Sequence, residues 1–143
     1  MTLILDTNVL SELMNPKGSP TVKAWVAQQE QKALHITSIT QAEILYGINI
    51  LPEGKRRQSL LDAAHAMFAQ EFAGKILAFN RTTAIHYAQI AAYRRTIGQP
   101  ISQFDAQIAA ICRDHSAAIA TRNVNDFLHC DIQILNPWDK PEA

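Results

Sequence analysis

The chain has 143 residues, 48% of them hydrophobic and 18% charged, and its 13 Lys and Arg residues balance 13 Asp and Glu residues. This composition excludes a disordered chain, and the zero net charge excludes a strongly basic nucleic-acid-binding protein of the histone type. Two cysteines, Cys112 and Cys130, are too few for a disulfide scaffold and lie in no CxxC motif, so we expect free thiols. The N-terminus lacks a signal-peptide pattern and no apolar stretch approaches the roughly 18 residues of a membrane helix, which predicts a cytoplasmic protein without membrane contact.

Short apolar segments, often β-branched, predict five strands. In chain order they are Leu3–Leu5, Leu34–Thr37, Ile76–Phe79, Ala117–Ala120 and Ile132–Leu135. Apolar runs of this kind, with little alternation of polar residues, are typical of strands buried on both faces of a parallel sheet.

Helical patterns separate these strands. The first helix begins at Ser19-Pro20, because Ser is a favourable N-cap and Pro suits the first helical position. Four more helices are predicted over Thr40–Asn49, Glu53–Phe72, Arg81–Ile97 and Ser102–His115. The alternation of strands and helices predicts right-handed crossovers and a three-layer α/β/α fold with a short-stranded parallel sheet, in one domain over residues 1–143.

The helix predicted over Arg81–Ile97 is apolar on two sides, with Ile85 in one stripe and Ile90 and Tyr93 in the other. Such a helix either packs twice inside its own chain or contributes to an interface, here a homodimer contact.

Acidic residues stand where predicted strands give way to helices. Asp6 directly follows the first strand, and Glu43 lies one turn into the helix after the second. Asp105 lies near the start of the last helix, and Asp126 follows the fourth strand. Because helices that follow parallel strands begin at the carboxyl edge of the sheet, where ligands bind in such folds, we expect the four carboxylates to converge there.

Each acid alone has an ordinary structural explanation, because acidic side chains at helix starts bond free backbone N–H groups. Thr40–Glu43 has the sequence of a capping box, and Ser102–Asp105 and Asn123–Asp126 have similar spacing. Four converging carboxylates would however repel one another, and a fold keeps such a cluster when a cation compensates it. Mg²⁺ or Mn²⁺ suits ligands that are all oxygen, and such an ion can activate water and hold a phosphate.

Other catalytic patterns find little support in the sequence. It contains no phosphate-binding P-loop and no GxGxxG fingerprint, and the DxD start of many metal-dependent phosphatases is absent because position 8 is Asn8. The histidines form no HxH or HExxH motif; they are His35, His65, His86, His115 and His129.

Four motifs, in order, resemble those of PIN-domain nucleases. They are Leu3–Glu12 with the DTN motif, Ser38–Gly47 with an AELxxG-like motif, Asp105–Ala110 with D-x-x-IAA, and Ala120–Phe127 with TRNxxDF. The ending Asn136-Pro137-Trp138 also resembles that of VapC- and FitB-type toxins. One departure is Gln103-Phe104 before Asp105, where the family often has Ala-Ala or Pro.

The resemblance implies a PIN-like fold and an Mg²⁺- or Mn²⁺-dependent ribonuclease, the toxin of a type II toxin–antitoxin pair. By position, Asp6, Glu43 and Asp105 match the family's most regular metal-binding acids, and Asp126 matches the fourth. Thr121 and Asn123 match polar positions near the metal. The resemblance also implies a VapB/FitA-type antitoxin, a homodimer, contact with DNA only through that antitoxin, and RNA as substrate, with tRNA as a guess.

Basic residues predict phosphate contacts, although most of them are equally typical of a solvated helix face. The candidates are Lys55-Arg56-Arg57, Arg81, Arg94-Arg95 and Arg122. Trp25 and Val26, with the helix over Glu53–Phe72, would offer either a groove for the antitoxin or simple core packing.

Two alternatives to the ribonuclease remain open at this stage. One is a non-catalytic PIN module that keeps its acids as helix caps and acts by binding a DNA-binding antitoxin. The other is a structure-specific DNA nuclease, for whose additional DNA-gripping elements 143 residues leave little room.

Overall fold

Parallel strands form the centre of the computed structural model, which describes residues 1–139. Within those residues the sheet has five strands in the order β3-β2-β1-β4-β5, and every neighbouring pair is parallel. The strands are β1 (Leu3–Leu5), β2 (Leu34–Thr37), β3 (Ile76–Leu77), β4 (Ala118–Ala120) and β5 (Ile134–Leu135). All five predicted strands are therefore confirmed, and three of them are shorter than predicted.

β3 ends earlier than predicted, whereas β4 and β5 begin later than predicted. β3 pairs with β2 only through Ile76 and Leu77, and Phe79 leaves the sheet to pack edge-on against Tyr87, with ring centroids 6.0 Å apart. Asp131, directly before the predicted start at Ile132, has a left-handed backbone with φ of 60°, and β5 begins two residues later than predicted, at Ile134.

Helices fill the connections between the strands. They are α1 (Thr7–Met14), α2 (Pro20–Ala27), α3 (Ser38–Asn49), α4 (Lys55–Gln70), α5 (Arg81–Thr96) and α6 (Gln103–Asp114), with short 3₁₀ helices η1 (Gln31–Ala33) and η2 (Val124–Phe127). The predicted start of α2 is confirmed, because the Ser19 hydroxyl accepts the Val22 N–H at 3.3 Å and Pro20 takes the first helical position. The predicted helices did not include α1, which begins directly after β1 without an intervening turn signal.

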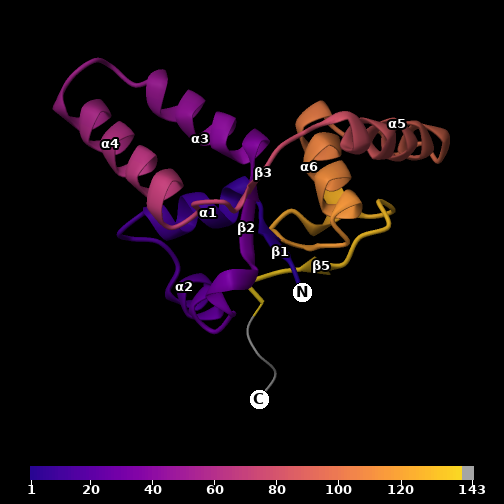
Figure 1. Ribbon diagram of the computed structural model, residues 1–143, viewed down its shortest axis with the longest axis horizontal. Coiled ribbons are helices and arrows are strands. Elements are labelled where there is room, and N and C mark those ends of the chain that lie inside the picture. The colour runs from indigo at the N-terminus through magenta and orange to yellow at the C-terminus, as the bar shows by residue number, and fades with distance from the viewer. Residues whose placement is uncertain (140–143) are drawn as a thin grey trace.

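Alternating side chains of the strands build two cores. Leu3 and Leu5 face the helices α1 to α4, whereas Ile4 faces α5 and α6. Figure 1 shows the same division, with α1 to α4 on one side of the strands and α5 and α6 on the other. The predicted three-layer α/β/α architecture is therefore confirmed.

Helix α5 buries one of its faces and exposes the others. Ile90 is buried in the core, whereas Ile85 and Tyr93 are 60% and 52% exposed. Of the two interpretations that the sequence left open, packing on two sides within the same chain is therefore wrong, and the exposed stripe stays a predicted interface. None of the helices in residues 1–139 combines the length and the hydrophobicity that crossing a membrane requires.

Candidate acidic site at the carboxyl edge of the sheet

The strand order reverses between β1 and β4. From β1 the chain proceeds to β2 and β3 on one side, and from β4 it proceeds to β5 on the other. Asp6 follows β1 and Thr121 follows β4, and the Thr121 hydroxyl donates a 2.8 Å hydrogen bond to Asp6 Oδ2. The two residues therefore mark the switch point at the carboxyl edge, where open α/β sheets bind their ligands.

Asp6 is the most buried carboxylate of this edge, with only 4% of its surface exposed. It caps α1, because its Oδ1 accepts the Thr7 N–H at 2.8 Å, and its Oδ2 accepts a bond from Asn8 Nδ2 at 3.3 Å. Burial raises the pKa of Asp6 to about 6, and the negative charges of Asp105 and Glu43 add to this rise against the opposing bonds from Thr121 and Thr7. Asp6 is thus both a helix cap and a member of a group of acids.

Glu43 lies deeper in its helix than the capping-box pattern predicts. Helix α3 begins at Ser38, and its cap is Thr37, whose hydroxyl accepts the Thr40 N–H at 3.1 Å. The prediction of a capping box at Thr40–Glu43 is therefore wrong, and Glu43 instead accepts a 2.9 Å bond from the Thr7 hydroxyl on α1. Burial raises the pKa of Glu43, and the charge of Asp105 raises it further.

Asp105 is the third residue of α6, one turn from its start. The predicted cap is confirmed, because the Ser102 hydroxyl accepts the Asp105 N–H at 3.2 Å. Burial raises the pKa of the Asp105 carboxyl, and the charge of Asp126 raises it further, while Ser102 and the positive charge of Arg94 oppose the rise. The charge of Asp105 therefore acts on the pKa of both Asp6 and Glu43, and the charge of Asp126 acts on the pKa of Asp105.

Asp126 and Asn123 lie on the exposed turn η2. The predicted side-chain cap at Asn123 is wrong: the Asp126 N–H bonds the Asn123 carbonyl oxygen at 3.0 Å, and the Asn123 side chain makes no capping bond. The Asn123 N–H donates to the Thr121 hydroxyl at 3.0 Å, so Thr121 joins η2 to Asp6.

The donor set fits a hard divalent cation. Four carboxylates with hydroxyl neighbours offer the oxygen ligands that Mg²⁺ and Mn²⁺ prefer. In residues 1–139, none of the four forms an ion pair with a Lys, Arg or His side chain. Within the same residues, no three Asp, Glu, His or Cys side chains are already drawn together as ligands of one ion.

Three residues that the sequence analysis did not assign to the site also organise it. Asn8 bridges the two strand ends, because its Nδ2 lies 3.4 Å from the Thr121 hydroxyl and its Oδ1 accepts the Arg122 N–H at 3.3 Å. The Thr40 hydroxyl lies 3.0 Å from that of Thr7. The third residue is Arg94. Arg94 was predicted to be exposed, as a phosphate contact or on a solvated helix face, and this prediction is wrong, because the residue is only 5% exposed and donates hydrogen bonds to backbone carbonyls.

The sequence offered a signal for one of these residues. Asn8 could have been predicted as a site residue because it lies two residues after Asp6, whereas nothing in the sequence distinguishes Arg94 from Arg95.

Two cavities adjoin Glu43. Arg56 lines a cavity of about 460 Å³ together with Thr7 and Glu43. On the other side of Glu43, Tyr46 and Phe104 line a cavity of about 500 Å³.

The Arg122 guanidinium lies over the ring of Trp138, 5.3 Å from its centroid. Such cation–π stacking restrains the guanidinium beside the end of β4. The C-terminal Asn136-Pro137-Trp138 segment thereby supports the site as well as packing against the core.

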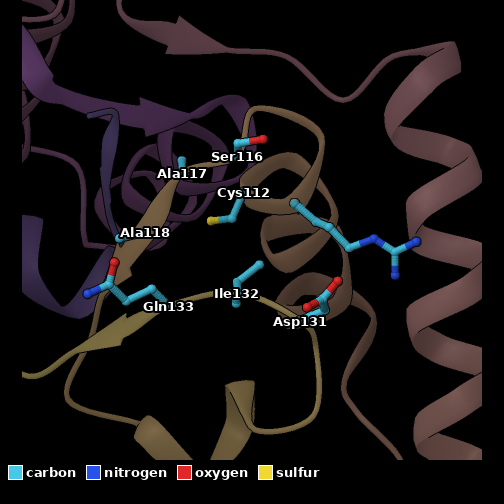
Figure 2. Close-up of a pocket in the computed structure, with 8 residues that line it drawn as sticks. Cys112, Ser116, Ala117, Ala118, Asp131, Ile132 and Gln133 are labelled. Carbon is cyan, nitrogen blue, oxygen red and sulfur yellow. The ribbon is translucent and has the colours of Figure 1, made fainter.

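A separate cavity lies at the opposite edge of the sheet, and none of the four acids lines it. Figure 2 shows Cys112 of α6 and Ser116 of the turn after it, with Asp131 and Gln133 from the segment before β5. Complete burial raises the pKa of the Cys112 thiol far above its ordinary value, so this cysteine is neutral and unsuited to nucleophilic chemistry. Cys112 and Cys130 are both free and buried, as predicted.

Comparisons with known proteins agree on one family. The family model described as PIN domain matches residues 3–132. The chain is 36% identical to Toxin FitB from Neisseria gonorrhoeae over 95% of this chain and 98% of that protein, and 34% identical to VapC ribonuclease Y4jK from Sinorhizobium fredii over 96% and 98%. The solved structure of FitAB bound to an IR36 DNA fragment superposes with a TM-score of 0.93 at 34% identity, covering 99% of both chains.

Proposed function

The chain belongs to the PIN-domain family, and from this premise we propose that it is the toxin of a type II toxin–antitoxin pair, acting as an Mg²⁺- or Mn²⁺-dependent endoribonuclease. The observation that carries the proposal is the burial of Asp6 among like charges, with its pKa raised to about 6. Maintaining such a cluster costs stability, and a bound divalent cation would compensate that cost. The names of the relatives, a toxin and a ribonuclease, support the same conclusion.

In this proposal Asp6, Glu43 and Asp105 hold the ion, directly or through water, and Asp126 completes the acidic pocket. When bound, the ion supplies an activated water and neutralises charge on the phosphate. Thr121 holds the Asp6 carboxylate by a 2.8 Å hydrogen bond, which fixes one ligand before an ion arrives. Asn123 lies on the same turn as Asp126 and is exposed, so its side chain is free to orient water or a phosphate oxygen.

Basic side chains beside the acids would bind the substrate. Arg56 lines the cavity next to Glu43, and Arg122 is restrained on Trp138. Contacts of this kind position a phosphate backbone without reading its sequence, so they support a nucleic-acid substrate. RNA as the substrate class is supported by the name of the relative VapC ribonuclease Y4jK, and tRNA is one candidate.

The proposal is tested by RNA cleavage with protein purified free of any partner. We expect cleavage of total RNA or tRNA with Mg²⁺ or Mn²⁺, none with EDTA, and none by an Asp105→Asn variant that folds normally. Restoring the ion to the EDTA-treated protein is expected to restore cleavage. Cleavage that persists in Asp105→Asn would contradict the assigned site. Absence of cleavage by the folded, ion-loaded protein would favour the non-catalytic module.

The proposed partner is a VapB/FitA-type antitoxin, which would make any DNA contact in place of this chain. An apolar cavity of about 300 Å³ between α4, α1 and α2 supports this, because Val26, Leu60 and Phe72 line it. Of the two residues predicted for a groove, Val26 lines this cavity although it is buried, whereas Trp25 packs against the core and is not among the lining residues. Leu60 and Met14 also line the cavity that reaches Glu43, so one bound segment could extend from α4 to the acids.

We further propose a homodimer formed through the exposed face of α5. Ile85→Asp is expected to weaken self-association by about 2 kcal/mol, or roughly 30-fold, because the new carboxylate would be desolvated at the contact. Analytical ultracentrifugation distinguishes the 15.9 kDa chain from its dimer. Ile50→Asp is the matched control, since Ile50 is similarly exposed (64%) but lies on the segment after α3. Equal weakening by both variants, or by neither, would contradict this face as the contact.

A further inference from the structure

Arg94 is a buried cation whose partners are backbone carbonyls. Its Nε donates to the Gln99 carbonyl oxygen at 2.6 Å, and its Nη1 donates to the carbonyl oxygens of Asp126 and Leu128, each at 2.9 Å. The Cys130 Sγ lies 3.7 Å from the same Nη1. A guanidinium buried in this way is expensive unless its hydrogen bonds are made, so these contacts define one position for the segments that carry the acceptors.

The segments held by Arg94 are those that bring Asp105 and Asp126 to the site. The turn η2 has only four residues and no side-chain cap. Within the turn the Asp126 N–H bonds the Asn123 carbonyl oxygen, and the bond from Arg94 to the Asp126 carbonyl oxygen ties this backbone to α5. The Gln99 carbonyl lies in the turn between α5 and α6, three residues before the Ser102 cap of α6. The Gln99 N–H returns a 2.9 Å bond to the Arg94 carbonyl, which closes this turn on the same residue.

We propose that Arg94 is a positioning residue of the acidic site, holding the backbone of Asp126 through its guanidinium so that the Asp126 carboxylate is presented for ion binding. This inference rests on the proposed metal-dependent function. The planar fork of a guanidinium bonds several carbonyls at fixed angles, whereas a lysine ammonium would keep the charge without this geometry. The neighbouring Arg95 is exposed and serves as an internal comparison.

Mn²⁺ binding to the purified full chain, measured by calorimetry or by electron paramagnetic resonance of free Mn²⁺, tests this role without reference to cleavage. We expect Arg94→Lys to weaken Mn²⁺ binding by about 10- to 100-fold, the range for groups that orient metal ligands. Asp126→Asn is expected to weaken binding similarly, and the double variant to show little further loss, because both changes act through one carboxylate. The control variant Arg95→Lys is expected to bind Mn²⁺ with the affinity of the unaltered chain.

Folding is monitored by circular dichroism, and binding is measured below the unfolding midpoint of each variant. Arg94→Met is a second variant, which keeps the aliphatic stem and removes the charge. Because that positive charge acts on Asp105, its removal by itself favours cation binding, so a loss of affinity in Arg94→Met would come from lost positioning. Full affinity in Arg94→Lys, which keeps the charge, or additive losses in the double variant, would overturn the positioning role while leaving the proposed function intact. No Mn²⁺ binding by the unaltered chain would overturn both.

Discussion

An Asp6→Asn variant is expected to lose RNA cleavage by about 10³-fold or more while remaining folded. Charge stabilisation by a metal ion contributes several kcal/mol, and about 4 kcal/mol corresponds to 10³-fold in rate. Asp6 is the acid whose loss would be felt most, because it is the most buried and is held by Thr121, Asn8 and the start of α1. An asparagine keeps the size of the side chain and one acceptor oxygen, so the cap on α1 can remain while the ionic ligand is lost.

The measurement is the cleavage rate with saturating Mg²⁺ or Mn²⁺, compared with a variant that makes the same chemical change elsewhere. Asp62→Asn serves as this control, because Asp62 is exposed on α4 and accepts a hydrogen bond from the Gln58 side chain of the same helix. The control is expected to cleave at the unaltered rate. A folded Asp6→Asn protein that retains more than about a tenth of the activity would contradict a metal-binding role for Asp6.

The parts of the fold that could be predicted are those with a strong local pattern. Strands buried on both faces appear in the sequence as short apolar runs, because each of their side chains packs against a helical layer. In β1, Leu3 and Leu5 face one layer and Ile4 faces the other. The positions of the acids relative to those strands then follow from the parallel topology. The apolar pattern could not predict the lengths of β3 and β5, because the length of a strand depends on how many of its residues pair with the neighbouring strand.

Other features depend on contacts between distant segments and were missed for that reason. Helix α1 continues an apolar strand without a break, so its start is defined by the Asp6 cap alone. The capping box predicted at Thr40 failed because Thr37 caps the helix instead, which frees Glu43 to accept a bond from Thr7 on another helix. Arg94 and Arg95 are alike in the sequence, and only the fold of η2 against α5 separates a buried positioning group from an exposed one.

The cost of keeping these acids together predicts how stability depends on pH. The pKa of Asp6 rises from 3.8 to about 6 on folding, so between these values the folded chain binds more protons than the unfolded chain. The contribution of protonated Asp6 to the free energy of unfolding is therefore complete below about pH 4 and is lost as the pH rises through 6. The loss amounts to about 3 kcal/mol at pH 7, at 1.36 kcal/mol per unit. The raised pKa values of Glu43 and Asp105 act in the same direction.

Urea unfolding in EDTA between pH 4 and 7.5 measures the free energy of unfolding of the unaltered chain and of Asp6→Asn. The difference between the two values isolates the contribution of Asp6, because the titration of all other groups is common to both proteins. We expect the variant to gain in relative stability as the pH rises, with most of the change between pH 4 and 6.5. A difference that does not vary with pH would contradict the burial of an ionised Asp6. Repeating the series with Mg²⁺ or Mn²⁺ should remove the loss in the unaltered chain alone, because an ion that binds only the folded state at 100 times its Kd adds about 2.7 kcal/mol. A stabilisation by the ion that the Asp6→Asn variant lacks would show that a cation bound among these acids offsets the free energy lost by gathering them.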